Sequence, residues 1–236
     1  GITAENAVHY TAADKHHPNA AGYAKVAPLQ VRFLEAHLPS LSWSYRFDDG
    51  SFAPIDLQAQ IDAVAAQGGG RVDVPKGRWL TDPIELKSRV ELHLSAGCEL
   101  FFTDELEKYL PAVRTTYEGI ECLNYRPLIS AYGATQIAIT GRGKIEPQMG
   151  RWETWRWNGP GTQQAKATLN EWGNRDVPVE ERNLTKLPGA KTRPPFVEFN
   201  GCTDIRLEGF MLRNSPFWCI HLLDCDRASV RGLSVS

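Results

Sequence analysis

The sequence predicts an all-β fold, with short strands stacked into a parallel β-solenoid. Two observations carry this prediction: a repeat of about 23 residues in the last fifth of the chain, and an earlier copy of the same pattern. A third is a single amphipathic helix directly before the first predicted strand, where an open solenoid end needs a cover. The predicted structure is therefore a column of coils closed at one end by a helix.

The repeat is visible when residues 196–212 (FVEFNGCTDIRLEGFML) are placed over residues 219–235 (CIHLLDCDRASVRGLSV). At an offset of 23, Cys202 falls on Cys225. Both copies alternate apolar and polar residues, which is typical of strands, and neither contains a helical stretch. A constant offset favours stacked coils over an antiparallel sandwich, the alternative with similarly spaced turns. Cys202 and Cys225 are then expected to be neighbours in the core.

An earlier copy lies at residues 128–145 (LISAYGATQIAITGRGKI), where Ile137 matches Ile205 at an offset of 68. The longer offset indicates one repeat plus a long insertion. We expect this insertion at about 148–192, where the strand pattern is weak. A less regular copy occurs at residues 88–102.

A helix is predicted within residues 54–70 (PIDLQAQIDAVAAQGGG). Its apolar residues recur at helical spacing: Leu57, Ile61, Val64 and Ala65. The glycines from Gly68 to Gly70 end the helix, and a strand follows at once. The position before the first coil favours a capping helix over the alternative, an ordinary surface helix.

The composition argues against several classes of function. The 236 residues carry a formal net charge of −2, so we expect no strong electrostatic attraction to nucleic acid. No apolar run approaches the ~20 residues that a membrane span requires. The five cysteines form no C-x-x-C pair, so we expect buried thiols, no metal site and no cofactor. The oligomeric state stays open.

Three segments in this order carry a family resemblance: residues 65–102, 120–147 and 193–235. They begin with AAQGGGRVDVPKG, IECLNYRPLISAYG and RPPFVEFNGCTDI. From about Asp48 to Ser236 the chain resembles the N-terminal half of glycoside hydrolase family 28, the polygalacturonase-like pectin hydrolases.

This resemblance implies a right-handed parallel β-helix, of which residues 51–236 would be the incomplete N-terminal part. It implies hydrolysis of galacturonic-acid-containing glycosidic bonds with inversion. The implied partner is a polysaccharide, pectin or galacturonan. The implied location is extracellular or periplasmic, and the chain shows no signal peptide.

Inverting hydrolysis needs two opposed carboxyl groups, roughly 6.5–9.5 Å apart, with room for a water. The family supplies them from an N-T-D-G motif and a following D-D motif, with G-H-G and R-I-K segments beyond, and none of these follows the predicted cap helix here. Asp48 and Asp49 precede the cap helix and are interpreted as part of a solvated turn. We therefore expect the catalytic aspartates beyond residue 236, and no hydrolysis by this chain alone.

The segment NSPFWCIH, residues 214–221, matches a family segment that lies just before the first catalytic strand. The resemblance implies that Trp218 and His221 are substrate-binding residues at the sugar-binding face. An aromatic ring can stack on a sugar, and an imidazole can bind a hydroxyl or carboxylate. The alternatives are a core tryptophan and a histidine whose hydrogen bonds are satisfied within its strand ladder.

The predicted insertion is rich in aromatic and cationic residues: Trp152, Trp155, Trp157, Trp172, Arg151, Arg156, Arg175, Arg182 and Arg193. Arginine can fork a carboxylate, so this composition fits a polyuronate ligand. The alternative is that the tryptophans pack against the flank of the solenoid.

The N-terminal stretch DKHHPNAAGY, residues 14–23, precedes a predicted helix. It is similar to the C-terminal end of SGNH (GDSL-type) hydrolases, whose D-x-x-H motif supplies the acid and base of a triad. The match makes His17 the base and Asp14 the acid that orients it, with the serine absent. Residues 1–40 are then a helical remnant of an α/β SGNH-like esterase domain, fused to the β-helix through a linker at 41–50. A solvated His-rich loop is the alternative.

Two other functions stay open for the β-helix. A pectate-lyase-type enzyme would eliminate rather than hydrolyse and would usually need Ca²⁺ held by clustered acids. A non-catalytic solenoid would bind polysaccharide without cleaving it.

Overall fold

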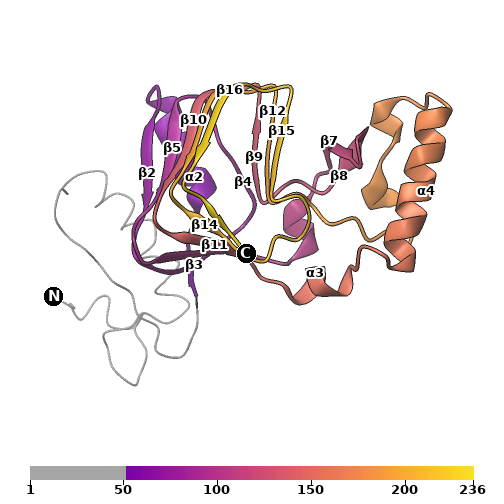
Figure 1. Cartoon of the computed structure of the whole chain (residues 1–236), viewed down its shortest axis with the longest axis horizontal. Coiled ribbons are helices and arrows are strands. Elements are labelled where there is room, and N and C mark those ends of the chain that lie inside the picture. The colour runs from indigo at the N-terminus through magenta and orange to yellow at the C-terminus, as the bar shows by residue number, and fades with distance from the viewer. Residues whose placement is uncertain (1–51) are drawn as a thin grey trace, which may run out of the picture.

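The structure, a computed structural model, describes residues 52–236 and consists mainly of parallel strands wound into a column of coils (Figure 1). The five-stranded sheet contains β2 (Gly70–Val74), β5 (Val90–Leu94), β10 (Thr135–Gly141), β13 (Thr203–Glu208) and β16 (Asp226–Arg231). The six-stranded sheet contains β1 (Ala53–Pro54), β3 (Gly77–Thr81), β6 (Cys98–Phe102), β11 (Lys144–Pro147), β14 (Met211–Leu212) and β17 (Ser234–Val235). The four-stranded sheet contains β4 (Ile84–Glu85), β9 (Ile129–Tyr132), β12 (Val197–Asn200) and β15 (Ile220–Leu223).

Each coil passes from the five-stranded sheet to the six-stranded sheet and then to the four-stranded sheet. All pairings within these three sheets are parallel, which confirms the predicted parallel β-helix and excludes the antiparallel sandwich. The register reproduces the sequence repeat. Ile137 pairs with Ile205 between β10 and β13, and Val197 pairs with Ile220 between β12 and β15.

An aliphatic ladder on the five-stranded sheet shows why the repeat is readable in the sequence. Val72, Leu92, Ile139 and Leu207 occupy successive rungs of one register. All four side chains are buried. Each such burial stabilises the fold by ~1.5–3 kcal/mol, so inward positions are restricted to apolar residues on coil after coil.

Recurring glycines mark a turn where neighbouring coils approach closely. Gly141 has φ +110°, and a Cβ there would lie 2.0 Å from the carbonyl oxygen of Leu94. Gly209 has φ +85°, and its Cβ would lie 2.6 Å from the carbonyl oxygen of Gly141. Glycine recurs at this turn because both the positive φ and the lack of space exclude a side chain.

The five cysteines are free thiols. Cys202 and Cys225 are neighbours on adjacent coils, as predicted, because β13 and β16 pair in register directly after them. Cys98, Cys122 and Cys202 are buried, whereas Cys219 and Cys225 are only partly buried, which corrects the expectation for those two. Burial raises the pKa of Cys98 to about 12, so that thiol is neutral at pH 7.

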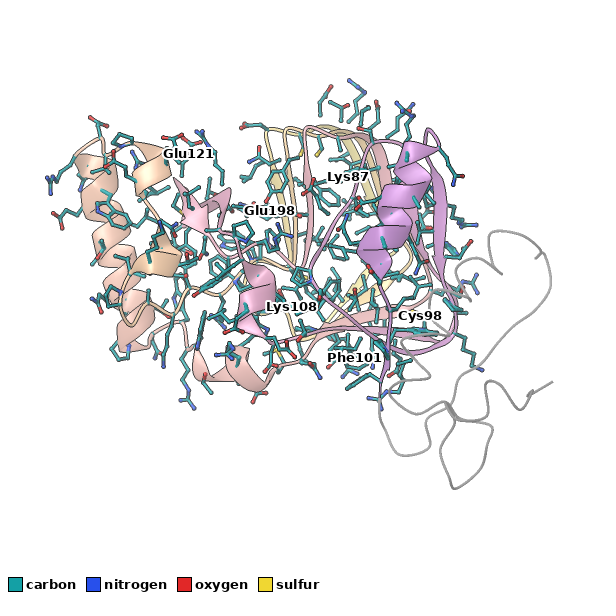
Figure 2. The ribbon with its side chains drawn as sticks, turned by 180° about the vertical axis from the view of Figure 1, so that it is seen from behind. Lys87, Cys98, Phe101, Lys108, Glu121 and Glu198 are labelled. Carbon is teal, nitrogen blue, oxygen red and sulfur yellow. The ribbon has the colours of Figure 1, made fainter. Side chains whose placement is uncertain are left out.

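Helix α2 (Leu57–Ala66) covers the end of the column next to β2 (Figures 1 and 2). The carboxylate of Asp56 caps it by accepting a hydrogen bond from the amide of Ala59 at 2.9 Å. Leu57 and Ile61 are fully buried against the first coils. The predicted capping helix is confirmed, and the surface-helix alternative is wrong.

Two excursions leave the coils on the side of the four-stranded sheet (Figure 1). The first contains η2 (Leu106–Tyr109) and an antiparallel hairpin of β7 (Val113–Tyr117) and β8 (Ile120–Asn124), which was not predicted. The second contains α3 (Gly150–Thr154), α4 (Pro160–Asn174), η3 (Val179–Glu181) and η4 (Leu184–Lys186). They share a small second core: Tyr117, Cys122, Ala165, Leu169 and Leu184.

The predicted SGNH-like remnant with Asp14 and His17, the linker at 41–50, and the turn at Asp48 and Asp49 all lie outside the described residues. Within residues 52–236, no helix is both long and apolar enough to cross a bilayer.

Candidate functional site

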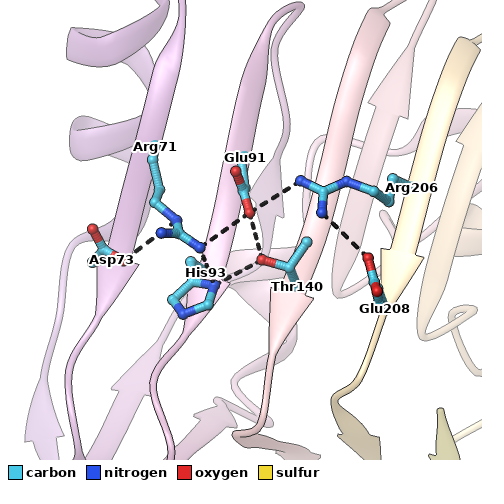
Figure 3. A network of polar contacts seen from close by, with 7 residues as sticks. All are labelled: Arg71, Asp73, Glu91, His93, Thr140, Arg206 and Glu208. Carbon is cyan, nitrogen blue, oxygen red and sulfur yellow. Dashed lines mark hydrogen bonds and ion pairs between the residues drawn. The ribbon is translucent and has the colours of Figure 1, made fainter. Parts of the chain in front are cut away.

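The described part of the molecule includes two hollows of ligand size. The first has a volume of about 580 Å³ and lies on the outer face of the five-stranded sheet. Its three arginines already have partners: Arg71 and Arg206 both contact Oε1 of Glu91, at 3.3 and 3.2 Å (Figure 3), and Arg89 donates to the carbonyl of Gly68 at 2.7 Å. Thr140 donates to the same oxygen at 2.6 Å. This network is satisfied within the sheet, and the second hollow is the better candidate.

The second hollow, called the aromatic hollow below, has a volume of about 460 Å³. It lies where the segment before β15 meets the two excursions. Its lining residues are Glu118, Trp157, Arg193, Ser215, Pro216, Phe217, Trp218 and Cys219. The predicted segment 214–221 therefore supplies much of this lining.

Trp218 presents a ring to solvent at the edge of the hollow. Its exposed fraction is 48%, so the alternative of a core tryptophan is wrong. The ring stacks on His221, with centroids 5.5 Å apart and planes at 19°, and meets Phe217 edge-on at 5.9 Å. The amide of Phe196 donates to the carbonyl of Trp218 at 2.8 Å, which fixes its backbone to the preceding coil. An exposed aromatic ring on a fixed backbone can pack against the apolar face of a sugar.

His221 is oriented by a buried glutamate that the sequence analysis missed. Nδ1 of His221 lies 2.9 Å from Oε2 of Glu198, its register partner on β12. Thr115 of the hairpin donates to the same oxygen at 2.7 Å. Figure 2 shows Glu198 between the coils and the hairpin. Since a carboxylate accepts the proton on Nδ1, Nε2 of His221 stays available for a ligand.

The surroundings of Glu198 disfavour the ionised form of its carboxyl group. The side chain is fully buried, and its Oε1 has no hydrogen-bond partner within residues 52–236. Burial raises the pKa of Glu198, and the hydrogen bonds from Thr115 and His221 oppose this effect. A sequence signal existed, because Glu198 alternates with Val197 and Phe199 and so had to point out of the coil, beside His221.

Aromatic contacts join the walls of the hollow. Phe217 stacks on Tyr117 of the hairpin, with centroids 4.9 Å apart, and on Trp157 of the insertion at 5.7 Å. Nζ of Lys166 on α4 lies 3.8 Å from the centroid of Trp157, a cation–π contact. The coil, the hairpin and the insertion therefore hold one another in place around the hollow.

The insertion only partly matches the expectation of a polyuronate-binding loop. Trp152 and Trp155 are buried and pack edge-on at 5.4 Å, so these two follow the packing alternative. Trp157 is 37% exposed and lines the hollow. Arg151 donates to the carbonyl of Asp104 at 2.8 Å, which makes it structural.

Two further arginines of the insertion are also bound locally. Arg182 donates to the carbonyl of Val177 at 2.6 Å, and Arg175 pairs with Glu171 at 3.1 Å. Arg193 differs from these, because it lines the hollow, and among the described residues its Nε has no hydrogen-bond partner and its guanidinium forms no ion pair.

The comparisons with known proteins agree with this picture. No protein-family model matches the chain. A protein named "Probable polygalacturonase" from Vitis vinifera is 24% identical over 189 residues, which covers 76% of this chain and 32% of that protein. A hyperthermoactive exopolygalacturonase from Thermotoga maritima has a solved structure that is 33% identical, with a TM-score of 0.72. That match covers 89% of this chain and 51% of the solved one.

The family 28 exopolygalacturonase from Yersinia enterocolitica is 22% identical with a TM-score of 0.54, covering 86% of this chain and 38% of that structure. The predicted right-handed parallel β-helix is confirmed. The chain is homologous to polygalacturonases in sequence and in structure, and these homologues are glycoside hydrolases. It spans about half the length of the Thermotoga maritima structure and about a third of the Vitis vinifera protein.

Proposed function

We propose that the described coils form the N-terminal, sugar-binding part of a polygalacturonase-like glycoside hydrolase that acts on the galacturonan of pectin. The observation that carries this proposal is Trp218, an exposed ring that lines the aromatic hollow and stacks on His221 beside it. The 33% identity to a Thermotoga maritima exopolygalacturonase supports the substrate class. A polymeric substrate fits an extracellular or periplasmic location.

In this proposal, Trp218 and His221 are substrate-binding residues. The indole packs on the CH face of a sugar ring, and Nε2 of His221 hydrogen-bonds a hydroxyl or carboxylate. Glu198 is a positioning residue, because it is buried and reaches the sugar only through His221.

Inverting hydrolysis requires two further carboxylates, and we assign them to strands that follow residue 236 in the parent protein. A strand added beside β15 on the four-stranded sheet would lie about 4.8 Å from it. Its outward side chains would stand next to His221 and would reach a sugar bound against Trp218. Glu198 itself is poorly suited to this role, because its carboxylate is enclosed and bound to Thr115 and His221.

The gene product that contains these coils and their continuation tests the proposal. With polygalacturonate, it should release reducing ends, and NMR of the first product should show an anomeric configuration inverted from that of the bond cleaved. Trp218→Ala should lower kcat/KM, whereas Leu110→Ala, a matched exposed apolar residue outside the hollow, should not. Ultraviolet-absorbing unsaturated products would instead indicate an eliminase, and binding without cleavage would indicate a polysaccharide-binding solenoid.

The predicted fusion to a carbohydrate esterase, with His17 as base and Asp14 as its orienter, stays a prediction. Sequencing upstream of residue 1 tests it, because a triad requires a serine-nucleophile block there. The absence of such a block from the gene would contradict this part of the proposal.

A further inference from the structure

We propose that Arg193 is the carboxylate receptor of the aromatic hollow, and that it selects uronate over neutral or esterified sugar units. This inference rests on the proposed function and adds to it the residue that recognises the acid group. The bound unit would place its carboxylate on the guanidinium and a ring face against Trp157 or Trp218.

Arg193 has no counter-ion among residues 52–236. Arg193 is half-buried, and its Nε is buried without a hydrogen-bond partner among residues 52–236. Within the same residues, no carboxylate lies within ion-pair distance of it. Burial lowers the pKa of Arg193, although the nearby Tyr117 opposes the effect, so the surroundings disfavour the cation. An anionic ligand would supply the charge partner that the fold does not.

The hollow on the five-stranded sheet provides the contrast. There, Arg71 and Arg206 share the carboxylate of Glu91, so both cations are neutralised by the protein itself (Figure 3). In the aromatic hollow, the acid among the lining residues is Glu118, which lies 4.0 Å from Nζ of Lys166. Among residues 52–236, Arg89 of the first hollow has no carboxylate partner but donates to the carbonyl of Gly68 at 2.7 Å, whereas Nε of Arg193 has no hydrogen-bond partner.

The backbone around Arg193 is also fixed before any ligand arrives. The hydroxyl of Thr192 donates to Oδ1 of Asn124 at 2.7 Å, and both residues are fully buried. Pro194 and Pro195 follow, both buried, and proline restricts its own φ and the conformation of the residue before it. A fixed backbone lowers the entropy cost of binding.

Exposed aromatic surfaces accompany the charge of Arg193. Phe196, three residues after Arg193, donates its amide to the carbonyl of Trp218, so the arginine and the exposed indole come from adjacent coils. Trp157 and Trp218 are 37% and 48% exposed. A cation beside two aromatic faces suits a ligand with a carboxylate and apolar CH faces. Inorganic phosphate has no such face, and a neutral sugar has no charge, so the chemistry points to a uronate.

Binding by the existing chain tests this proposal without requiring catalysis. Calorimetry would compare trigalacturonate with its fully methyl-esterified form, for the wild type, Arg193→Gln and Arg193→Lys. Arg193→Gln should weaken binding of the acid form by about tenfold to a hundredfold and leave the ester unchanged. Arg193→Lys should lie between, because it keeps the charge and loses the fork. Arg142→Gln, which removes an exposed arginine at the turn after β10, is the matched control.

The outcomes distinguish a failure of this inference from a failure of the proposed function. If the wild type binds trigalacturonate and Arg193→Gln binds it equally well, this inference is overturned and the proposed function stands. Equal wild-type affinity for the acid and ester forms would also overturn this inference and leave the proposed function standing. If the wild type binds neither form, the proposed function fails and this inference fails with it. Arg193→Gln should unfold at or above the wild-type temperature, and a clear fall would assign Arg193 to the fold and overturn the inference.

Discussion

Replacing Glu198 with alanine tests how the buried carboxylate holds the candidate site together. In the wild type, one oxygen of Glu198 accepts from Thr115 at 2.7 Å and pairs with Nδ1 of His221 at 2.9 Å. Thr115 belongs to the hairpin and His221 to the coils, so the alanine variant disconnects two parts of the structure. It also removes the acceptor that both donors share, and leaves the hydroxyl of Thr115 with a long 3.4 Å contact to the carbonyl of Thr116.

The magnitude follows from the burial of these groups. Thr115 is 1% exposed, and the side chain of His221 is 16% exposed, so water replaces the lost acceptor poorly. Each unsatisfied donor costs about 1–3 kcal/mol. Removal of a buried, desolvated carboxylate offsets part of this cost. We expect the free energy of unfolding to fall by about 2–4 kcal/mol, which corresponds to roughly 4–16 °C in Tm for a chain of this size.

Urea unfolding of Glu198→Ala and Glu198→Gln measures this difference. The glutamine keeps an oxygen for both donors, so its free energy of unfolding should fall by only about 1 kcal/mol. The alanine variant should also bind trigalacturonate more weakly, because His221 loses its orientation. Equal losses of less than 0.5 kcal/mol (about the scatter of neutral substitutions) in both variants would refute the reasoning.

Two other predictions concern the coils. Leu207→Ala empties one rung of the buried aliphatic ladder and should cost about 2–5 kcal/mol in urea unfolding, whereas Val230→Ala, on the next rung and 48% exposed, should cost far less. A loss for Val230→Ala as large as that for Leu207→Ala would contradict the ladder. Burial alone would raise the pKa of Glu91, but the hydrogen bond from Thr140 and the nearby arginines lower it overall from its ordinary 4.5. Because the pKa of Glu91 is lower in the folded state, its carboxylate stabilises the fold above pH 4.5, and this contribution is lost as the pH falls through the folded-state pKa. Glu91→Gln should therefore lower the free energy of unfolding at pH 7, and the difference from the wild type should vanish in acid. A difference that grows in acid would contradict this assignment.

The coils were predictable from the sequence because stacking restricts equivalent positions on successive coils. The sequence offset between Cys202 and Cys225 equals the offset between paired residues of β12 and β15. Aligning the repeats in sequence therefore also identifies the residues that are neighbours in space. The capping helix was predictable because Leu57 and Ile61 share one face.

The excursions were less predictable, because they follow no repeat. The hairpin did have a local signal, since Glu118 and Gly119 adopt φ of +53° and +83° at a two-residue turn, and glycine favours such a turn. Sequence alone could not separate Arg193 from Arg182 or Arg151, because what distinguishes them is whether the folded chain supplies a partner.

The position at which a uronate oligomer contacts this chain is the most direct test of the sugar-binding role of the aromatic hollow. Trigalacturonate would be titrated into isotopically labelled protein while NMR follows the indole Nε1–H and guanidinium Nε–H signals. We expect shifts for Trp157, Trp218 and Arg193, and none for the buried Trp152. Shifts confined to the Arg206 face of the five-stranded sheet, or no shifts at saturating ligand, would contradict that role.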